Sequence, residues 1–459
     1  MSDMPRPDVS RSDTPTSDTP RSDVSSDTSR LHGWFLAVAL LWMAVNNGVM
    51  LWNTRAQIRQ GYGDFASFYT AGTLVRRGLG PELYNPAAQW KVQQEFASVE
   101  IRQGPLPYIR PPFEALLFSV FARWPYVTAL FLWTALKLAL LVAIPFVVVE
   151  GGSWRGGSSL GGSVRGGSWK QTIPLWAVGF LTLGTFPEFM DVLLGQDAAL
   201  LAFLFAISFW QLATDRDVGA GLTLGLALFK FQLVIPFVMA LWIAGRKRVI
   251  PGFATSAIAV LGISAGIVGW RGLLRYPRDL LALNQATGVG VITPQNQMNL
   301  RGLLIFAVGR EPYPGGIHWA LAPVALAAIV CAGLLWRKAG DRLLAEGFGL
   351  ALIAAIVTSY YAQEYDLLLL IVPLLATRAR AADAAPADRV TRYLEASGLL
   401  LLLLTPLYWF TRLQLSAECL MTLPMLAVGF AWARRLRDAR AGVGAETIKM
   451  MAPVPGGPG

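Results

Sequence analysis

The chain has 459 residues, of which 54% are apolar and 15% are charged, and its formal net charge is +10. A soluble globular domain carries about 25% charged residues, so the composition excludes an ordinary soluble protein. The positive charge gathers in short clusters between apolar runs, which is typical of a multi-pass membrane protein and argues against nucleic acid as a partner. The two cysteines, Cys331 and Cys419, both lie in apolar runs and indicate neither a disulfide framework nor a metal site.

The N-terminal third of the chain begins with a polar segment. Residues 1–30 repeat a Ser-Asp unit with proline and arginine, cannot bury a core, and are expected to form a disordered cytoplasmic tail. The apolar run 33–52 is too long and begins too late for a cleavable signal peptide, so it predicts the first span. Residues 53–110 are rich in aromatics and lack a span, and we expect an extracytoplasmic loop with interfacial helices.

Apolar runs recur from residue 112 to residue 433 and complete a membrane domain over 31–437. Several hold too few residues for a full crossing, which indicates broken helices that border a cavity. We predict an all-α polytopic membrane protein, a helical bundle with about 10–12 transmembrane helices. The Gly-Ser repeat at 151–170 predicts a flexible linker, and 438–459 predicts a disordered tail.

Basic clusters predict the orientation of this bundle. Residues 246–248 and the arginines at 434, 435 and 437 should face the cytoplasm, which places the loop 53–110 on the extracytoplasmic side. That loop is itself basic, which weakens the assignment, although long loops follow the rule poorly. We expect a multi-pass protein of the cell membrane, the inner membrane of a bacterium.

The stretch QGYGDFASFYTAG, residues 60–72, places one carboxylate shortly after the first span. Asp64 precedes a helical segment, and aspartate is a good N-cap. A carboxylate at the membrane surface is also suited to deprotonate a hydroxyl as a general base. Both interpretations stay open on spacing alone, and Tyr69 joins the stretch as a candidate for substrate contact.

Two further motifs place polar groups at the ends of apolar runs, where ionisable side chains are suspects for function. PLPYIRPPFEALLF, residues 105–118, holds Tyr108, Arg110 and Glu114. Arg110 either binds a lipid phosphate through a forked contact or anchors the helix end. The Gly-Gln-Asp turn at 195–197 presents Gln196 and is expected to face a polar cavity.

Three more motifs follow in the second half of the chain. Lys230, with Gln232 nearby, stands in an apolar stretch, where a lone lysine must snorkel, pair or meet an anion. Between residues 293 and 306, a polar cluster suits a sugar or a phosphate, although a plain loop fits equally well. That cluster consists of Asn296, Gln297, Asn299 and Arg301. In SYYAQEYDLLLLIVP, residues 359–373, Glu364 and Asp366 stand at the break between two runs.

The order of these motifs resembles glycosyltransferase family 87, whose members use polyprenyl-phosphate sugars and have the GT-C membrane fold. The resemblance runs from about residue 60 to residue 376 and is carried by GDFASFYTAG, LYNP, YIRPPFEALLFSVFARWP, GQDAALLAF, AGLTLGLALFKFQ, NQMNLRGLL and YYAQEYDLLLLIVPLL. It implies that Asp64 is the catalytic base. It also matches Gln196 to the family's Gly-Gln turn, and Lys230 and Gln232 to its Lys-x-Gln turn. Relatives often carry a histidine in the last stretch, which has Glu364 and Asp366 here, so a role taken from that histidine does not transfer.

The resemblance implies an inverting, mannosyltransferase-like enzyme that takes a hexose from a polyprenyl-phosphate sugar. The acceptor would be a glycolipid or glycan hydroxyl at the extracytoplasmic face, among membrane lipids and with no cofactor or metal. A transporter or lipid flippase is the alternative, because it would use Lys230, Glu114 and Asp191 along a substrate pathway. The sequence lacks the two similar halves that many transporters show. A structural subunit without catalysis is the third hypothesis.

Overall fold

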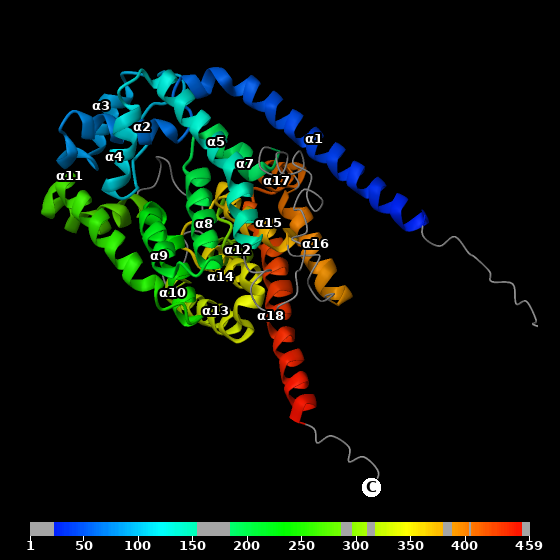
Figure 1. Ribbon diagram of the computed structural model, residues 1–459. Helices are drawn as coiled ribbons and strands as arrows, with labels where there is room; N and C mark the ends of the chain where they lie inside the picture. The colour runs from blue at the N-terminus through cyan, green and yellow to red at the C-terminus, as the bar shows by residue number, and fades with distance from the viewer. Residues whose placement is uncertain are drawn as a thin grey trace, which may run out of the picture.

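The computed structural model describes residues 23–153, 184–285, 296–309, 317–379, 388–403 and 405–451. Within these ranges the chain is helical and contains no strand (Figure 1). The prediction of an all-α polytopic membrane protein is thereby confirmed. The expectations for residues 1–22, for most of the Gly-Ser repeat and for residues 452–459 lie outside the described residues.

The helices follow one another in chain order, with short 3-10 helices marked η. They are α1 (Asp23–Arg59), α2 (Phe65–Arg76), η1 (Gly80–Glu82), α3 (Pro86–Gln93), α4 (Pro112–Phe121), α5 (Tyr126–Ser153), α7 (Phe186–Leu194), α8 (Ala198–Ala213), α9 (Asp217–Leu226), η3 (Ala227–Lys230), α10 (Phe231–Ile243), α11 (Val249–Gln285), α12 (Leu300–Val308), α13 (Ile317–Ala339), η5 (Gly340–Leu343), α14 (Leu344–Thr358), η6 (Glu364–Leu370), α15 (Ile371–Ala379), α16 (Arg389–Leu403), α17 (Thr405–Leu413), η7 (Glu418–Met421) and α18 (Thr422–Met451). We expected the membrane domain to begin at residue 31 and to end at residue 437. Helix α1 begins before the first of these positions, and α18 ends after the second.

Four helical stretches are long and apolar enough to cross a membrane. They are Tyr126–Val149, Asp217–Ile243, Val249–Leu280 and Ala320–Thr358, and the bent pair α16–α17 adds a fifth if it counts as one span. Among the described residues this is fewer than the 10–12 spans expected. The difference arises because a crossing needs about 20 residues, whereas apolar helices such as α4 and α8 hold only 10 and 16.

Helices α2, α3 and α4 gather at one end of the molecule, where α1 ends and α5 begins (Figure 1). Aromatic side chains hold this end together: Phe68 stacks on Phe118 with ring centroids 4.7 Å apart. A Cβ atom at Gly72 would lie 2.4 Å from the carbonyl oxygen of Phe118. Helix α2 therefore lies against α4 only because position 72 has no side chain.

The expected cytoplasmic cluster at 246–248 lies at the opposite end of the bundle from Asp197. Helix α8 has 16 residues and spans about 24 Å from Asp197 to Thr214. Arg246 pairs with Asp217, at the start of α9, with a nitrogen–oxygen distance of 3.1 Å. Because α9 begins where α8 ends, the basic cluster and Asp197 are separated by about the length of α8.

Candidate functional site

Asp64 lies in the short connection between α1 and α2, directly before Phe65. Arg102 fixes this connection, since its guanidinium donates to the carbonyl oxygens of Gly61 at 3.1 Å and Tyr62 at 3.0 Å. The Asp64 side chain makes no capping hydrogen bond to α2. Its Oδ2 atom instead accepts a hydrogen bond from Nε2 of Gln196 at 2.5 Å. Asp64 is half-buried.

Two glycines bring Asp64 and Gln196 together. Gly195 ends α7 in the left-handed conformation, with φ of 68°, and a Cβ atom there would lie 2.6 Å from Cβ of Phe65. A Cβ atom at Gly63 would lie 2.7 Å from the carbonyl oxygen of Leu194. The two turns are thus in backbone contact, and this contact sets the distance between Asp64 and Gln196.

A chain of polar contacts extends inward from Gln196. Its Oε1 atom accepts a hydrogen bond from Arg110 at 3.1 Å. Arg110 also pairs with Asp197 at 3.1 Å, and Asp197 pairs with Lys230 at 2.9 Å. Lys230 makes a second ion pair, with Asp366. The contacts join residues before α4, before α8, at the end of η3 and within η6, so four motifs far apart in sequence form one network.

The network is buried more deeply than Asp64, which is half-buried. Lys230, Asp197 and Asp366 are 0% exposed, and Arg110 is 6% exposed. Removing one partner of a buried ion pair typically destabilises a protein by about 3–5 kcal/mol, because the remaining charge is uncompensated. Lys230 thus pairs with two carboxylates instead of snorkelling, and it reaches the Asp64 region only through Asp197 and Arg110.

The surroundings of Asp64 make it a stronger base than an ordinary aspartate. Burial raises the pKa of Asp64, while the hydrogen bond from Gln196 and the charges of Arg110 and Arg102 act in the opposite direction. Burial is the largest of these effects, and the pKa lies above its usual value. A raised pKa favours uptake of a proton from a hydroxyl group.

Tyr108 and Glu114 support the segment that carries Arg110. The hydroxyl of Tyr108 lies 3.1 Å from Oε2 of Glu114, and both side chains are buried. The hydroxyl of Tyr84 donates to the carbonyl oxygen of Arg110 at 2.7 Å. These contacts fix the backbone at the start of α4 and so orient the guanidinium toward Gln196.

The polar cluster at 296–301 makes contacts of another kind. Asn299 caps α12, because its Oδ1 accepts from the backbone nitrogen of Gly302 at 2.8 Å, and its Nδ2 donates to the carbonyl oxygen of Ser359 at 3.0 Å. The guanidinium of Arg301 lies over the ring of Tyr360, 4.2 Å from its centroid. Asn296 is half-buried at the start of this described segment. The cluster therefore ties the start of α12 to residues 359–362.

The remaining candidates lie in separate surroundings. Glu364 pairs with Arg412 at 3.0 Å. Gln232 is half-buried in the first turn of α10. The hydroxyl of Tyr69 donates to the carbonyl oxygen of Trp124 at 3.0 Å. The structure thus brings Gln196 and Arg110 to Asp64 and links Lys230 to them. Glu364, Gln232 and Tyr69 have other neighbours.

The sequence assigned no role to Asp197, Asp366 or Arg102, although Asp197 and Asp366 stand within motifs that it named. Asp197 contacts both Arg110 and Lys230, so it connects the two cations. A signal for it was present, since Asp197 directly follows Gln196 and an acid at the end of an apolar run is a suspect for function. Arg102 carried no such signal, because it stands in a polar loop.

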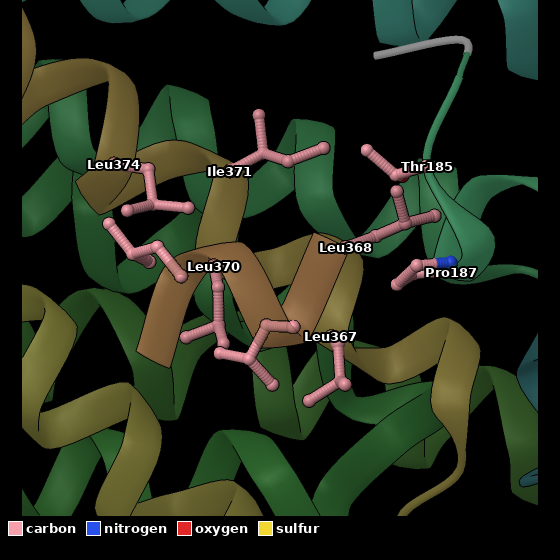
Figure 2. A pocket seen from close by; sticks show the side chains of 9 residues that line it. Thr185, Pro187, Leu367, Leu368, Leu370, Ile371 and Leu374 are labelled. Atoms are coloured by element: carbon pink, nitrogen blue, oxygen red, sulfur yellow. The ribbon is translucent and has the colours of Figure 1, made fainter. Parts of the chain in front are cut away.

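An apolar hollow lies elsewhere, between the start of α7 and helices η6, α15 and α16. Figure 2 shows that the side chains around it are almost all aliphatic. Its volume is about 20 Å³, which is room for roughly one water molecule. It is lined by Thr185, Pro187, Leu367, Leu368, Leu370, Ile371, Leu374, Leu399 and Leu402. A hollow of this size and composition cannot hold a sugar, so it is not a candidate site.

Comparison with known families gives a match to glycosyltransferase family 87 over residues 108–362. The match covers more than half of the chain and includes Arg110, Gln196 and Lys230, whereas Asp64 precedes it. Searches among curated proteins and among solved structures found no match. Membership of a glycosyltransferase family, together with several apolar helices, identifies a membrane glycosyltransferase and disfavours a transporter or a structural subunit. The chain therefore belongs to glycosyltransferase family 87.

Proposed function

We propose that the protein transfers a hexose from a polyprenyl-phosphate sugar to a lipid- or glycan-linked hydroxyl at the extracytoplasmic face. The hexose that we propose is mannose. The observation that carries this proposal is the position of Asp64. Asp64 is half-buried, its side chain makes no capping hydrogen bond to α2, and its carboxylate accepts a hydrogen bond from Gln196 at 2.5 Å. A carboxylate that is oriented but not consumed by structural contacts is suited to act as a general base.

The reaction needs one proton transfer and one displacement. Asp64 accepts the proton of the acceptor hydroxyl while that oxygen attacks the anomeric carbon of the donor sugar. The bond between this carbon and the phosphate oxygen breaks, and the lipid phosphate leaves with the electron pair. A single displacement of this kind inverts the anomeric configuration.

The leaving phosphate gains negative charge, which a cation near Asp64 would stabilise. Arg110 is the best placed of the three cations suggested by the sequence, because Gln196 bonds to both Arg110 and Asp64. Lys230 is enclosed by Asp197 and Asp366, and Arg301 stacks on Tyr360. We therefore assign Arg110 to the phosphate, and we assign Lys230 to positioning Arg110 through Asp197.

Asp64→Asn tests the proposal, because it keeps the size of the side chain and removes the base. We expect transfer to fall by about 10²–10⁴-fold, the usual contribution of a general base. The assay uses purified full-length protein in lipid nanodiscs with radiolabelled polyprenyl-phosphate sugars, and compares mannose with other hexoses. Glu100→Gln is the matched control, since Glu100 is an exposed acid in the same loop.

Near-normal transfer by Asp64→Asn would overturn the role of Asp64. Transfer by the wild-type protein from a nucleotide sugar, but not from the polyprenyl-phosphate sugar, would overturn the proposal that the donor is a polyprenyl-phosphate sugar. The stereochemistry is tested by NMR of the product, in which retention of the anomeric configuration would contradict a single displacement. Mass spectrometry of envelope glycolipids, from cells with and without the gene, would identify the sugar and the acceptor.

A further inference from the structure

A second hollow, here called the α2 hollow, lies beside α2. Its volume is about 330 Å³, within the range of small-molecule pockets. Its charged side chains come from three places: Arg59 at the end of α1, Arg76 and Arg77 at the end of α2, and Glu95 shortly after α3. Tyr69, Phe96 and Tyr126 form its aromatic floor.

The charges of the α2 hollow do not balance. Arg77 and Glu95 satisfy each other through two parallel contacts of 2.7 and 2.6 Å. Arg59 and Arg76 are exposed, and neither forms an ion pair within the described ranges of the chain. Two guanidinium groups therefore face the hollow with their donors available to a ligand.

The floor of the hollow is rigid and has few hydrogen-bonding groups to offer. Phe96 stacks on Tyr126 with centroids 4.3 Å apart, and Tyr69 meets both rings edge-on. The hydroxyl of Tyr69 already donates to Trp124, and that of Thr73 donates to the carbonyl oxygen of Tyr69. The arginines are thus the main donors, so the hollow favours an anionic ligand over a neutral one.

The hollow also lies at a membrane boundary. Arg59 is the last residue of α1, and Tyr126 is the first residue of the apolar span Tyr126–Val149. Next to it, Trp124 and Val127 are 42% and 46% exposed, as expected for side chains in contact with lipid. An anion at this depth is most simply the head group of a membrane lipid.

We propose that the α2 hollow binds the phosphate of an anionic membrane lipid through Arg59 and Arg76. Arginine suits this role because its planar fork matches two phosphate oxygens at once. Along α2, Arg76 is twelve residues from Asp64, which is a rise of about 18 Å. The lipid is therefore a bound neighbour of the enzyme and not the reacting group, and the proposal does not depend on the role of Asp64.

Native mass spectrometry of the full-length protein in detergent tests this site, with dihexanoyl phosphatidylglycerol as the lipid. We expect Arg59→Gln/Arg76→Gln to weaken binding by at least about 10-fold, because each charge-assisted contact contributes about 1.5–3 kcal/mol. Arg123→Gln is the matched control, since Arg123 is an exposed arginine near the same boundary but does not line the hollow. Asp64→Asn should bind the lipid as the wild type does.

Four outcomes would contradict the proposal. The first is equal binding of the lipid by the wild type and the double variant. The second is equal binding of phosphatidylglycerol and phosphatidylcholine, because the hollow would then not select net negative charge. The third is displacement of the lipid by inorganic phosphate at the same concentration, which would identify a site for free phosphate. Loss of binding in Asp64→Asn as well would also contradict a site that is separate from the catalytic one.

Discussion

Gly195→Ala is the substitution that most directly tests how the candidate site is assembled. Gly195 has φ of 68°, a conformation in which a residue with a Cβ atom is less stable by about 1–2 kcal/mol. The added Cβ would also lie 2.6 Å from Cβ of Phe65, too close for two carbon atoms. Overpacking of this kind costs about 1–3 kcal/mol, so the two effects together predict a loss of about 2–5 kcal/mol.

The substitution should affect catalysis more than stability alone predicts. Relief of the contact with Phe65 must move the turn that carries Gln196 away from Asp64. A displacement of about 1 Å at a catalytic group lowers rates by roughly 100-fold. We therefore expect a transfer rate reduced by about that factor in protein that still folds and purifies.

Gly309→Ala provides a matched control for the conformational part of this effect. Gly309 also ends a helix in the left-handed conformation, with φ of 61°, but a Cβ atom there would meet no atom of the described residues within 4 Å. It should lose only about 1–2 kcal/mol and keep its transfer rate. Unfolding in mixed detergent micelles measures stability, and the polyprenyl-phosphate assay measures transfer. Equal stability and equal transfer in the two variants would refute the close contact between the turns.

Three further predictions concern protonation and capping. Because only deprotonated Asp64 can accept a proton and burial raises its pKa, transfer should fall on acidification at a higher pH than for an ordinary aspartate. Gln196→Met removes a hydrogen bond that lowers the pKa of Asp64. The acid limb of the pH profile of kcat/KM should therefore move to higher pH in this variant. An unmoved limb would contradict the assignment of Asp64 as the base. Asn299→Ala should reduce stability by about 0.5–2 kcal/mol, as the loss of a cap does, and leave the KM for the donor unchanged. A raised KM at unchanged stability would instead support the substrate role that the sequence suggested.

The fold class could be predicted from the sequence because it depends on composition, which the bilayer constrains strongly. The number of spans could not be predicted as well. The run that contains Lys230 illustrates this, since α9, η3 and α10 form one apolar stretch, Asp217–Ile243, broken by a 3-10 turn at that lysine. A count of apolar runs that is divided at this lysine gives two runs, whereas the structure has one candidate span there.

The candidate site could be predicted only in part, because its pairings depend on tertiary packing. The sequence singled out Arg110, Gln196 and Lys230 as polar groups in apolar surroundings, which needs no knowledge of their partners. It did not single out Asp197 as the residue between two cations, because Arg110 and Lys230 lie 87 and 33 positions away in the chain. Such contacts become visible only when α4, α8 and η3 are placed in space.

Asp64 and Asn299 show how backbone geometry separates two residues that the sequence presents alike. Both stand directly before a short helix and both are good N-cap types. Asn299 has φ of −147° and ψ of 172°, the extended conformation from which its side chain reaches the nitrogen of Gly302. Asp64 has φ of −67° and ψ of −19°, already helical, and its side chain makes no such contact. The carboxylate is therefore available to Gln196, and this difference is why we expect substitution of Asn299 to affect stability and substitution of Asp64 to affect chemistry.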